Sequence, residues 1–273
     1  MVENLLNSIV DILKTIYQIL LGEQILIYQM AKVGSSSLEE AIKKEDIPVK
    51  HIHSYYGTLN YYFDERTSCI GRIKKPLFKL CFKLRKKELK VITIMRDPIA
   101  RNISALFQSL YIMIYKHQLE DNKKEESFQD MMDVFMEKYV NTDIPLTWFD
   151  RELKEYLGID VLKYKFNKES GYTVIKQNNI NLLVLTTERI NENTSVICNF
   201  LGLPKLKLNS SNRSSSKWYS EIYKQYVDEF SITDEQIDYF YKSPVIKHFY
   251  SDKDIDNFID TWSKNSIGRE DTF

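Results

Sequence analysis

The chain has 273 residues, and 38 Lys and Arg residues balance 38 Asp and Glu residues, so the formal net charge is zero. This balance argues against a general nucleic-acid binder, which needs a basic excess to neutralise phosphates. Hydrophobic residues make up 43% of the chain, with only 8 Gly and 6 Pro, which excludes collagen-like, low-complexity and mostly disordered classes. We therefore expect a globular protein with a sizeable core.

The three cysteines, Cys69, Cys81 and Cys198, are odd in number, and neither they nor the His and acidic residues show metal-ligand spacing. They argue against a disulfide framework and fit a reducing compartment. We predict a cytoplasmic protein that needs no metal.

Residues 1–23 predict an N-terminal amphipathic helix. Apolar residues recur there at helical spacing: Leu5, Ile9, Ile12, Leu13 and Ile16. Glu3, Asp11 and Lys14 interrupt the stretch before the roughly 18 uncharged residues of a membrane span, and a signal-peptide pattern is missing. We expect this helix to pack on the domain. Peripheral membrane contact is the alternative, disfavoured because the polar face is not rich in Lys or Arg.

Four stretches predict strands, and all but the second of them are apolar runs typical of buried strands. They are residues 25–30, 47–55, 89–95 and 180–185, and helical patterns follow them. This alternation implies βαβ crossovers and hence an α/β fold, a three-layer domain with a central parallel sheet and a helical insertion around residues 110–165. We assign residues 24–250 to this domain and residues 251–273 to a C-terminal helix and tail.

Two of the predicted strand-to-helix junctions carry basic residues, and ligand anions bind at such junctions. The first is the run from Lys32 to Leu38, in which Gly34 would let the backbone approach a phosphate and Ser36 with Glu39 forms a capping box. It is not a Walker A loop, because the Lys precedes the Gly and a second Gly is missing. A capped loop without a ligand is the alternative.

The second junction runs from Arg96 to Ser104. Asp97 and Pro98 predict a helix start, and Arg96 with Ser104 could reach a second phosphate. A structural ion pair between Arg96 and Asp97 is the alternative.

Together, these two junctions resemble the 5'-phosphosulfate loop and the 3'-phosphate motif of sulfotransferases that use 3'-phosphoadenylyl sulfate (PAPS). The residues that carry the resemblance are Lys32-Val33-Gly34-Ser35-Ser36-Ser37-Leu38 and Arg96-Asp97-Pro98 with Arg101 and Ser104. Further landmarks are Trp148 to Leu153, Gly158 to Val161 and Leu182 to Leu203. The run Ser216-Lys217-Trp218-Tyr219-Ser220 is similar to the Asn-Lys-Trp-Tyr-Ser signature of a bacterial family described as putative capsular polysaccharide synthesis proteins, departing at its first residue.

The resemblance implies a P-loop-like sulfotransferase fold that moves a sulfuryl group from PAPS to a hydroxyl and releases adenosine 3',5'-bisphosphate. It implies that residues 32–37 (Lys32, Val33, Gly34, Ser35, Ser36 and Ser37) hold the 5'-phosphosulfate and that Arg96 and Ser104 hold the 3'-phosphate. Lys32 would neutralise the leaving phosphate, and Arg213 and Lys217 would close over the nucleotide. The family label implies a cell-surface or capsular saccharide as acceptor.

The acceptor hydroxyl also needs a base. His51 and His53 are two residues apart in a predicted strand and therefore share a face, and a neutral imidazole accepts a proton at neutral pH. We choose His53, which is nearer the ligand edge, with Glu39 and Glu65 in reserve. The alternative is that both histidines are structural.

Two rival functions remain open. One is a non-catalytic nucleotide-binding or assembly protein of the same fold. The other is a P-loop kinase, which the position of Lys32 before Gly34 disfavours. The basic stretch of residues 72–90 is a solvated helix face, an anionic glycan or nucleotide site, or a membrane-surface contact.

Overall fold

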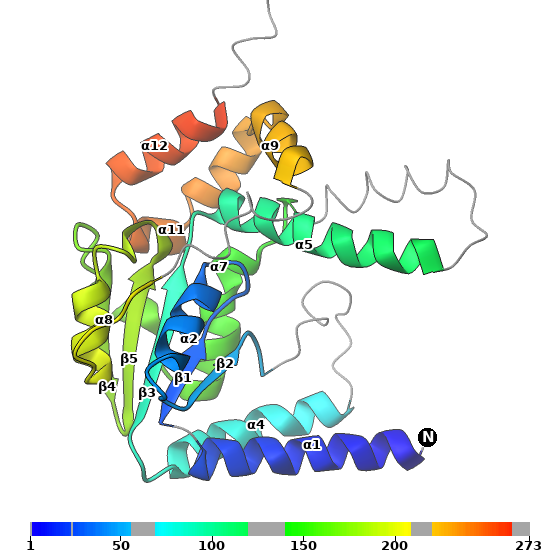
Figure 1. Ribbon diagram of the computed structural model, residues 1–273, viewed down its shortest axis with the longest axis vertical. Helices are drawn as coiled ribbons and strands as arrows, with labels where there is room; N and C mark the ends of the chain where they lie inside the picture. The colour runs from blue at the N-terminus through cyan, green and yellow to red at the C-terminus, as the bar shows by residue number, and fades with distance from the viewer. Residues whose placement is uncertain (1, 23, 56–68, 120–139, 209–219, 264–273) are drawn as a thin grey trace, which may run out of the picture.

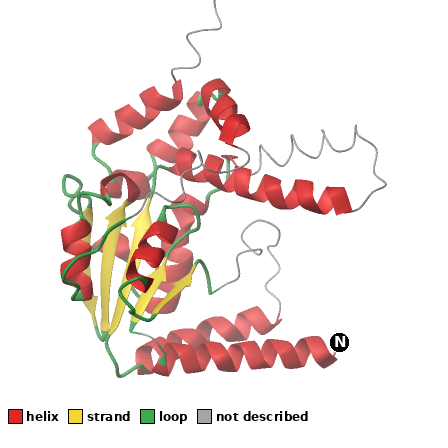
Figure 2. Cartoon of the chain, viewed as in Figure 1, coloured by secondary structure: helices red, strands yellow, loops and turns green. Residues whose placement is uncertain are grey.

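A five-stranded sheet forms the centre of the molecule (Figures 1 and 2). The computed structural model describes residues 2–22, 24–55, 69–119, 140–208 and 220–263. The strands lie in the order β2-β1-β3-β5-β4. Their bounds are β1 Ile25–Tyr28, β2 Val49–Ile52, β3 Leu89–Met95, β4 Tyr172–Gln177 and β5 Ile180–Thr186.

Four of these strands are parallel, which confirms the predicted α/β class with a parallel sheet. The apolar runs form the buried centre: all of β1 is buried, and so is most of β3 and β5. The sequence analysis did not anticipate β4, which pairs antiparallel with β5 at the edge of the sheet. Asn178, at a φ of 53°, lies in the tight turn between them, and Asn is among the few residues that tolerate this backbone conformation.

Helices cover both faces of the sheet, with α2 (Ser35–Lys43) on one face and α7 (Ile144–Trp148) with the π-helix η1 (Phe149–Leu157) on the other (Figure 1). The remaining helices are α1 Val2–Leu21, α4 Cys69–Leu84, α5 Pro98–Leu119, η2 Val161–Lys163, η3 Thr187–Arg189, α8 Thr194–Leu201, α9 Ser220–Glu229, α10 Asp234–Gln236, η5 Ile237–Tyr241, α11 Pro244–Phe249 and α12 Asp252–Ser263. Among the described helices, none combines the length and apolarity needed to cross a bilayer.

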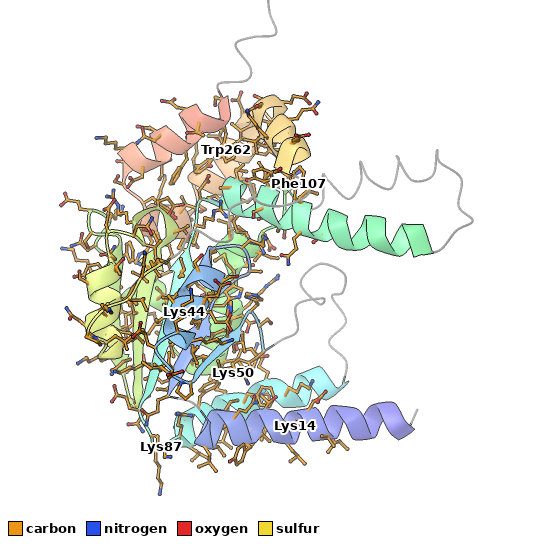
Figure 3. The ribbon with its side chains drawn as sticks, in the orientation of Figure 1. Lys14, Lys44, Lys50, Lys87, Phe107 and Trp262 are labelled. Carbon is orange, nitrogen blue, oxygen red and sulfur yellow. The ribbon has the colours of Figure 1, made fainter. Side chains whose placement is uncertain are left out.

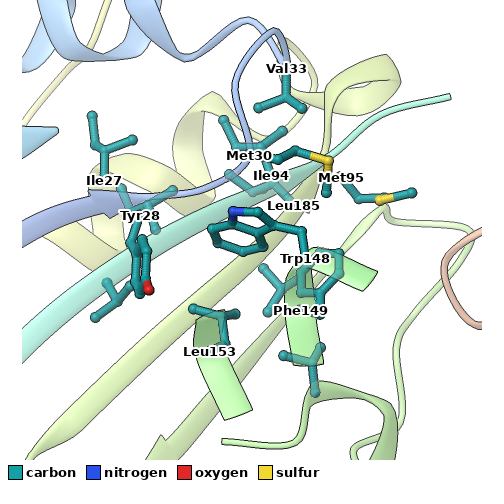
Figure 4. Packing of buried hydrophobic residues seen from close by; sticks show 14 of the residues in the cluster. Ile27, Tyr28, Met30, Val33, Ile94, Met95, Trp148, Phe149, Leu153 and Leu185 are labelled. Carbon is teal, nitrogen blue, oxygen red and sulfur yellow. The ribbon is translucent and has the colours of Figure 1, made fainter. Parts of the chain in front are cut away.

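The region that we predicted as a helical insertion contributes to the core in its described part. Trp148, Phe149 and Leu153 are buried and pack against the strands (Figure 4). In the described part of this region, residues 144–157 are helical, as predicted, and they form a layer that covers one face of the sheet. The charge run from Glu120 to Glu126 lies outside the described residues.

Helix α1 packs alongside α4, as we expected for the N-terminal helix. Buried Arg85 fixes its end, donating from Nη1 to the Ile19 carbonyl at 2.6 Å and from Nη2 to the Gly22 carbonyl at 3.3 Å. The predicted apolar face was wrong in part. Ile12 and Ile16 pack against the core, whereas Ile9 and Leu13 are exposed, because α4 covers only one side of the helix.

Candidate functional site

The loop after β1 is held by side chains from the ends of β3 and β5. The carbonyl oxygens of residues 31, 32 and 33 accept hydrogen bonds from Arg101 Nε at 3.0 Å, Arg96 Nη1 at 2.8 Å and Thr187 Oγ1 at 2.9 Å. The same Thr187 hydroxyl lies 3.1 Å from the Met95 carbonyl oxygen. Three strand ends thus meet at one edge of the sheet, as the crossover topology requires.

These bonds turn three successive carbonyls toward the protein. Lys32 and Gly34 adopt positive φ values of 74° and 83°, which is costly for a lysine and ordinary for glycine. Helix α2 begins at Ser35, so the N–H groups of its first turn, residues 35–37, have no partner within the helix. The loop therefore presents unpaired N–H groups at the start of α2, which is the arrangement that binds anions.

Helix α2 begins at Ser35, within the serine run as predicted, but the predicted capping box is wrong. Gly34 is the N-cap residue, so Ser36 falls inside the first turn. The Glu39 carboxylate instead binds Lys43 Nζ and His51 Nδ1, each at 2.6 Å. Although burial alone raises it, the pKa of Glu39 is lowered on balance by these two partners.

We call residues 31–37 the anion loop, after the ligand class predicted for it. A chain of hydrogen bonds links Glu39 to this loop through His51. His51 Nδ1 bonds to Glu39, and His51 Nε2 lies 3.1 Å from both Ser35 Oγ and Gln29 Nε2. Gln29 Nε2 also donates to Ser35 Oγ. Because a carboxylate oxygen only accepts, His51 Nδ1–H donates to Glu39. In this neutral tautomer Nε2 accepts from Gln29 Nε2 and Ser35 Oγ, which fixes the Ser35 hydroxyl at the start of α2.

His53 lies just past β2, on the same face as His51, as predicted, with the two rings 4.7 Å apart at their centroids. Its Nδ1 is 3.3 Å from the Gln29 carbonyl oxygen, so Nδ1 carries the proton, and Nε2 has no partner among the described residues. Trp148 Nε1 donates to the His53 carbonyl at 2.9 Å. Burial, with a smaller contribution from His51, lowers the pKa of His53, so the imidazole is neutral at pH 7.

The predicted site residues differ in how far they are buried and in whether they bond to one another. Val33 and Ser35 are buried, Lys32 and Ser37 are half-buried, and Ser36 is exposed. Arg96 is tied to the loop through its bond to Lys32, whereas no hydrogen bond joins it to Ser104, which lies two turns into α5. Arg213, Lys217 and the reserve base Glu65 lie outside the described residues.

Asp97 caps α5 as predicted, accepting from the N–H groups of Ile99 and Ala100 at 3.3 Å. The alternative of a structural ion pair with Arg96 is not realised. The buried Asp97 carboxylate instead accepts from Tyr241 Oη at 2.6 Å and Trp262 Nε1 at 2.8 Å. Burial raises the pKa of Asp97 despite these donors.

Three supporting residues were not anticipated from sequence: Gln29, Thr187 and Glu152. Thr187 follows a buried strand directly, which is the signal that could have revealed it. Glu152 is fully buried in η1 and accepts from Tyr28 Oη, Ser54 Oγ and the Tyr55 N–H. It therefore ties the exits of β1 and β2 to the layer beneath the sheet. Among the described residues, no group of three or more His, Cys, Asp or Glu side chains could hold a metal ion.

The site thus combines the loop at the start of α2 with His53 beside it, and the family comparison bears on a later part of the chain that supports them. Residues 122–251 match the family model NKWYS, "Putative capsular polysaccharide synthesis protein". No curated protein and no solved structure matches the chain.

The matched range includes Trp148, which binds the His53 carbonyl, Thr187, which binds the Val33 carbonyl in the loop, and Glu152, which binds the Tyr55 N–H. It stops short of the anion loop itself, of His53 and of Arg96. Over residues 122–251, the chain is thus similar to proteins described as acting in capsular polysaccharide synthesis.

Proposed function

We propose that this protein is a sulfotransferase that moves a sulfuryl group from PAPS to a hydroxyl of a cell-surface or capsular saccharide. The observation that carries the proposal is the loop of residues 31–37, in which Arg101, Arg96 and Thr187 bind three successive carbonyls and helix α2 begins at Ser35. A loop of this kind suits the 5'-phosphosulfate of the donor. The saccharide acceptor rests on the NKWYS match alone.

The proposed site divides the reaction among three side chains. The acceptor oxygen forms a bond to sulfur while the bond from sulfur to the bridging oxygen breaks, and His53 Nε2 takes the hydroxyl proton. Lys32 neutralises the charge that develops on the released 5'-phosphate, because such transfers depend on positioning and electrostatic stabilisation. Arg96 uses one guanidinium nitrogen on the Lys32 carbonyl and keeps its other donors for the 3'-phosphate.

Calorimetry with PAPS, adenosine 3',5'-bisphosphate and ATP tests the donor. We expect the bisphosphate to bind tightly and ATP weakly. Arg96→Ala should weaken bisphosphate binding by about 2 kcal/mol, since a charge-assisted contact is lost, whereas Lys32→Ala should chiefly lower turnover. Tighter binding of ATP than of the bisphosphate would favour a kinase instead.

Transfer of labelled sulfate from PAPS to saccharides extracted from the cell surface tests the reaction itself. Tight bisphosphate binding without any transfer would favour the second candidate, a non-catalytic nucleotide-binding or assembly protein. The anion loop and the NKWYS match fit this second candidate equally well, because neither a fold nor a binding loop establishes catalysis.

A further inference from the structure

Helix α1 is apolar on two sides, and only one of them is covered. Ile12, Ile16 and Ile19 pack against the core. The adjoining side carries an exposed row at spacings of three and four residues, made of Ile9, Val10, Leu13, Tyr17 and Leu21. Leu13 and Tyr17 are 59% and 64% exposed, so this row faces solvent along most of the helix.

Helix α4, which packs beside α1, also carries exposed apolar residues. Leu80 and Leu84, one turn apart, are 50% and 59% exposed. Where side chains are described, these two helices contain seven of the nine exposed large hydrophobic residues, the others being Val174 and Tyr239. Single exposed apolar residues are ordinary on a protein surface, whereas a concentration of this kind marks an interaction surface.

Exposed lysines accompany the apolar residues. They are Lys14 in α1, Lys79 and Lys83 in α4, and Lys86 and Lys87 in the turn that follows. None forms an ion pair with a carboxylate of the described residues. Asp11 and Glu88 are the only described acidic side chains on α1, α4 and this turn. We call the surface formed by these lysines and the apolar row the basic apolar face.

The opposite end of the molecule is acidic. Helix α12 carries Asp252, Asp254, Asp256 and Asp260 against one lysine, and it lies at the far end of the long axis from α1 (Figures 1 and 3). Because the chain has no net charge, this separation gives the molecule a basic end and an acidic end. A negatively charged plane would attract the first and repel the second.

We propose that the basic apolar face is a peripheral membrane contact that binds a bilayer rich in anionic phospholipids. The apolar row would enter the boundary between head groups and acyl chains, with α1 and α4 lying in the membrane plane, while the lysines contact the anionic head groups. A second copy of this chain fits the face less well, because it would bring lysines against lysines. The proposal does not depend on the sulfotransferase activity.

This orientation has a consequence for the candidate site. Helices α1 and α4 lie beneath the amino ends of the strands, whereas the anion loop is at the carboxyl ends (Figure 1). A molecule bound through the basic apolar face would turn the anion loop away from the bilayer. The loop would stay open to a water-soluble nucleotide.

Sedimentation of the full chain with lipid vesicles tests the proposal. We expect binding to vesicles of phosphatidylcholine mixed with phosphatidylglycerol, little binding to phosphatidylcholine alone, and loss of binding as salt is added. The double variant Leu13→Glu with Tyr17→Glu should bind no vesicles. Lys79→Ala with Lys83→Ala should lower the affinity roughly 30-fold, because each surface lysine contributes a factor of about five.

Matched variants elsewhere on the surface are the controls. Val174→Glu with Tyr239→Glu changes equally exposed apolar residues, and Lys205→Ala with Lys207→Ala changes exposed lysines, so both should bind vesicles like the unmodified chain. Circular dichroism checks that every variant is folded. Equal vesicle binding by the unmodified chain and the α1 variant would overturn the proposal. So would a dimer in lipid-free solution that the α1 variant dissociates.

Discussion

His53 is the residue on which the proposed chemistry depends most. Its Nδ1 donates to the Gln29 carbonyl, and its own carbonyl accepts from Trp148 Nε1. In the proposed reaction its Nε2 accepts the proton of the acceptor hydroxyl. His53→Ala should lower turnover roughly 100-fold, since a general base is removed, and should leave bisphosphate affinity nearly unchanged. The pH dependence of kcat/KM in the unmodified protein should fall on the acid side below 6.5, because the pKa of His53 is lowered, and the variant should lack this limb.

The control for this prediction is His248→Ala. Burial also lowers the pKa of His248, but this residue packs against Phe166 and Phe249, apart from the anion loop. We expect its variant to keep both turnover and the acid limb. If His53→Ala lost stability while the folded fraction kept full turnover, His53 would be structural and Glu39 would be the next base to test.

At the scale of elements, the turn from β1 into α2 depends on Gly34. A Cβ at this position would lie 3.7 Å from Thr187 Cγ2, so space is available and the cost of Gly34→Ala comes from the φ of 83°. We expect a loss of about 1–2 kcal/mol in the free energy of unfolding. Bisphosphate binding should also weaken, because the new methyl group would lie on the loop that approaches the phosphate.

Gly202 provides the comparison, since it has a φ of 81° at the end of α8 and open space around its Cβ position. Gly202→Ala should cost a similar stability and leave bisphosphate affinity unchanged. Urea denaturation and calorimetry on both variants separate the two effects. Equal bisphosphate affinities in the two variants would argue against an anion site at the loop.

The π-helix η1 ties the layer beneath the sheet to the exits of β1 and β2 through Glu152. Glu152→Ala would remove the acceptor that Tyr28, Ser54 and the Tyr55 N–H share, so we expect it to lower the free energy of unfolding by about 3–5 kcal/mol. Glu155→Ala in the same helix removes an exposed pair with Lys75 and should cost about 1 kcal/mol or less. Similar losses in the two variants would contradict the role of Glu152.

For the whole molecule, Asp97 joins the start of α5 to the C-terminal helices through Tyr241 and Trp262. Because burial raises its pKa above the ordinary 3.8, Asp97 contributes stability that is fully present below pH 3.8 and is lost as the pH rises through the raised value. Asp97→Asn should therefore flatten this part of the dependence of unfolding free energy on pH. Urea denaturation at a series of pH values measures the effect.

Asp256→Asn, which changes an exposed aspartate of α12, is the control and should keep the pH dependence of the unmodified protein. An Asp97→Asn variant with an unchanged pH dependence would show that Asp97 has the same proton affinity in the folded and unfolded chain.

Local chemistry was enough to predict β1, β3 and β5, the start of α5 at Asp97 and the course of α1. Buried parallel strands are continuous apolar runs, and an Asp followed by Pro favours a helix start where a helical apolar pattern follows, as it does here. Strand β4 was not predicted, because its apolar and polar residues are mixed and do not form an apolar run. As an edge strand it is stabilised mainly by pairing with β5, which the sequence does not reveal. Ile9 and Leu13 of α1 were predicted to lie on the packed face but are exposed. Helical periodicity shows that a face is apolar, but it does not show how much of that face a partner helix will cover.

In the candidate site, the sequence by itself determined which residue types stand at the strand ends: Lys32, Gly34, Arg96 and the pair His51 and His53. Only the tertiary structure decided their connections. His51 is bound to Glu39 and Ser35, the Nε2 of His53 has no partner in the part of the chain that the structure describes, and Arg96 bonds to the Lys32 carbonyl rather than to Asp97. The reason is physical. A hydrogen bond depends on two atoms meeting within about 3 Å, and the partners here are separated by up to 64 residues of chain, so only the packing of the sheet brings them together.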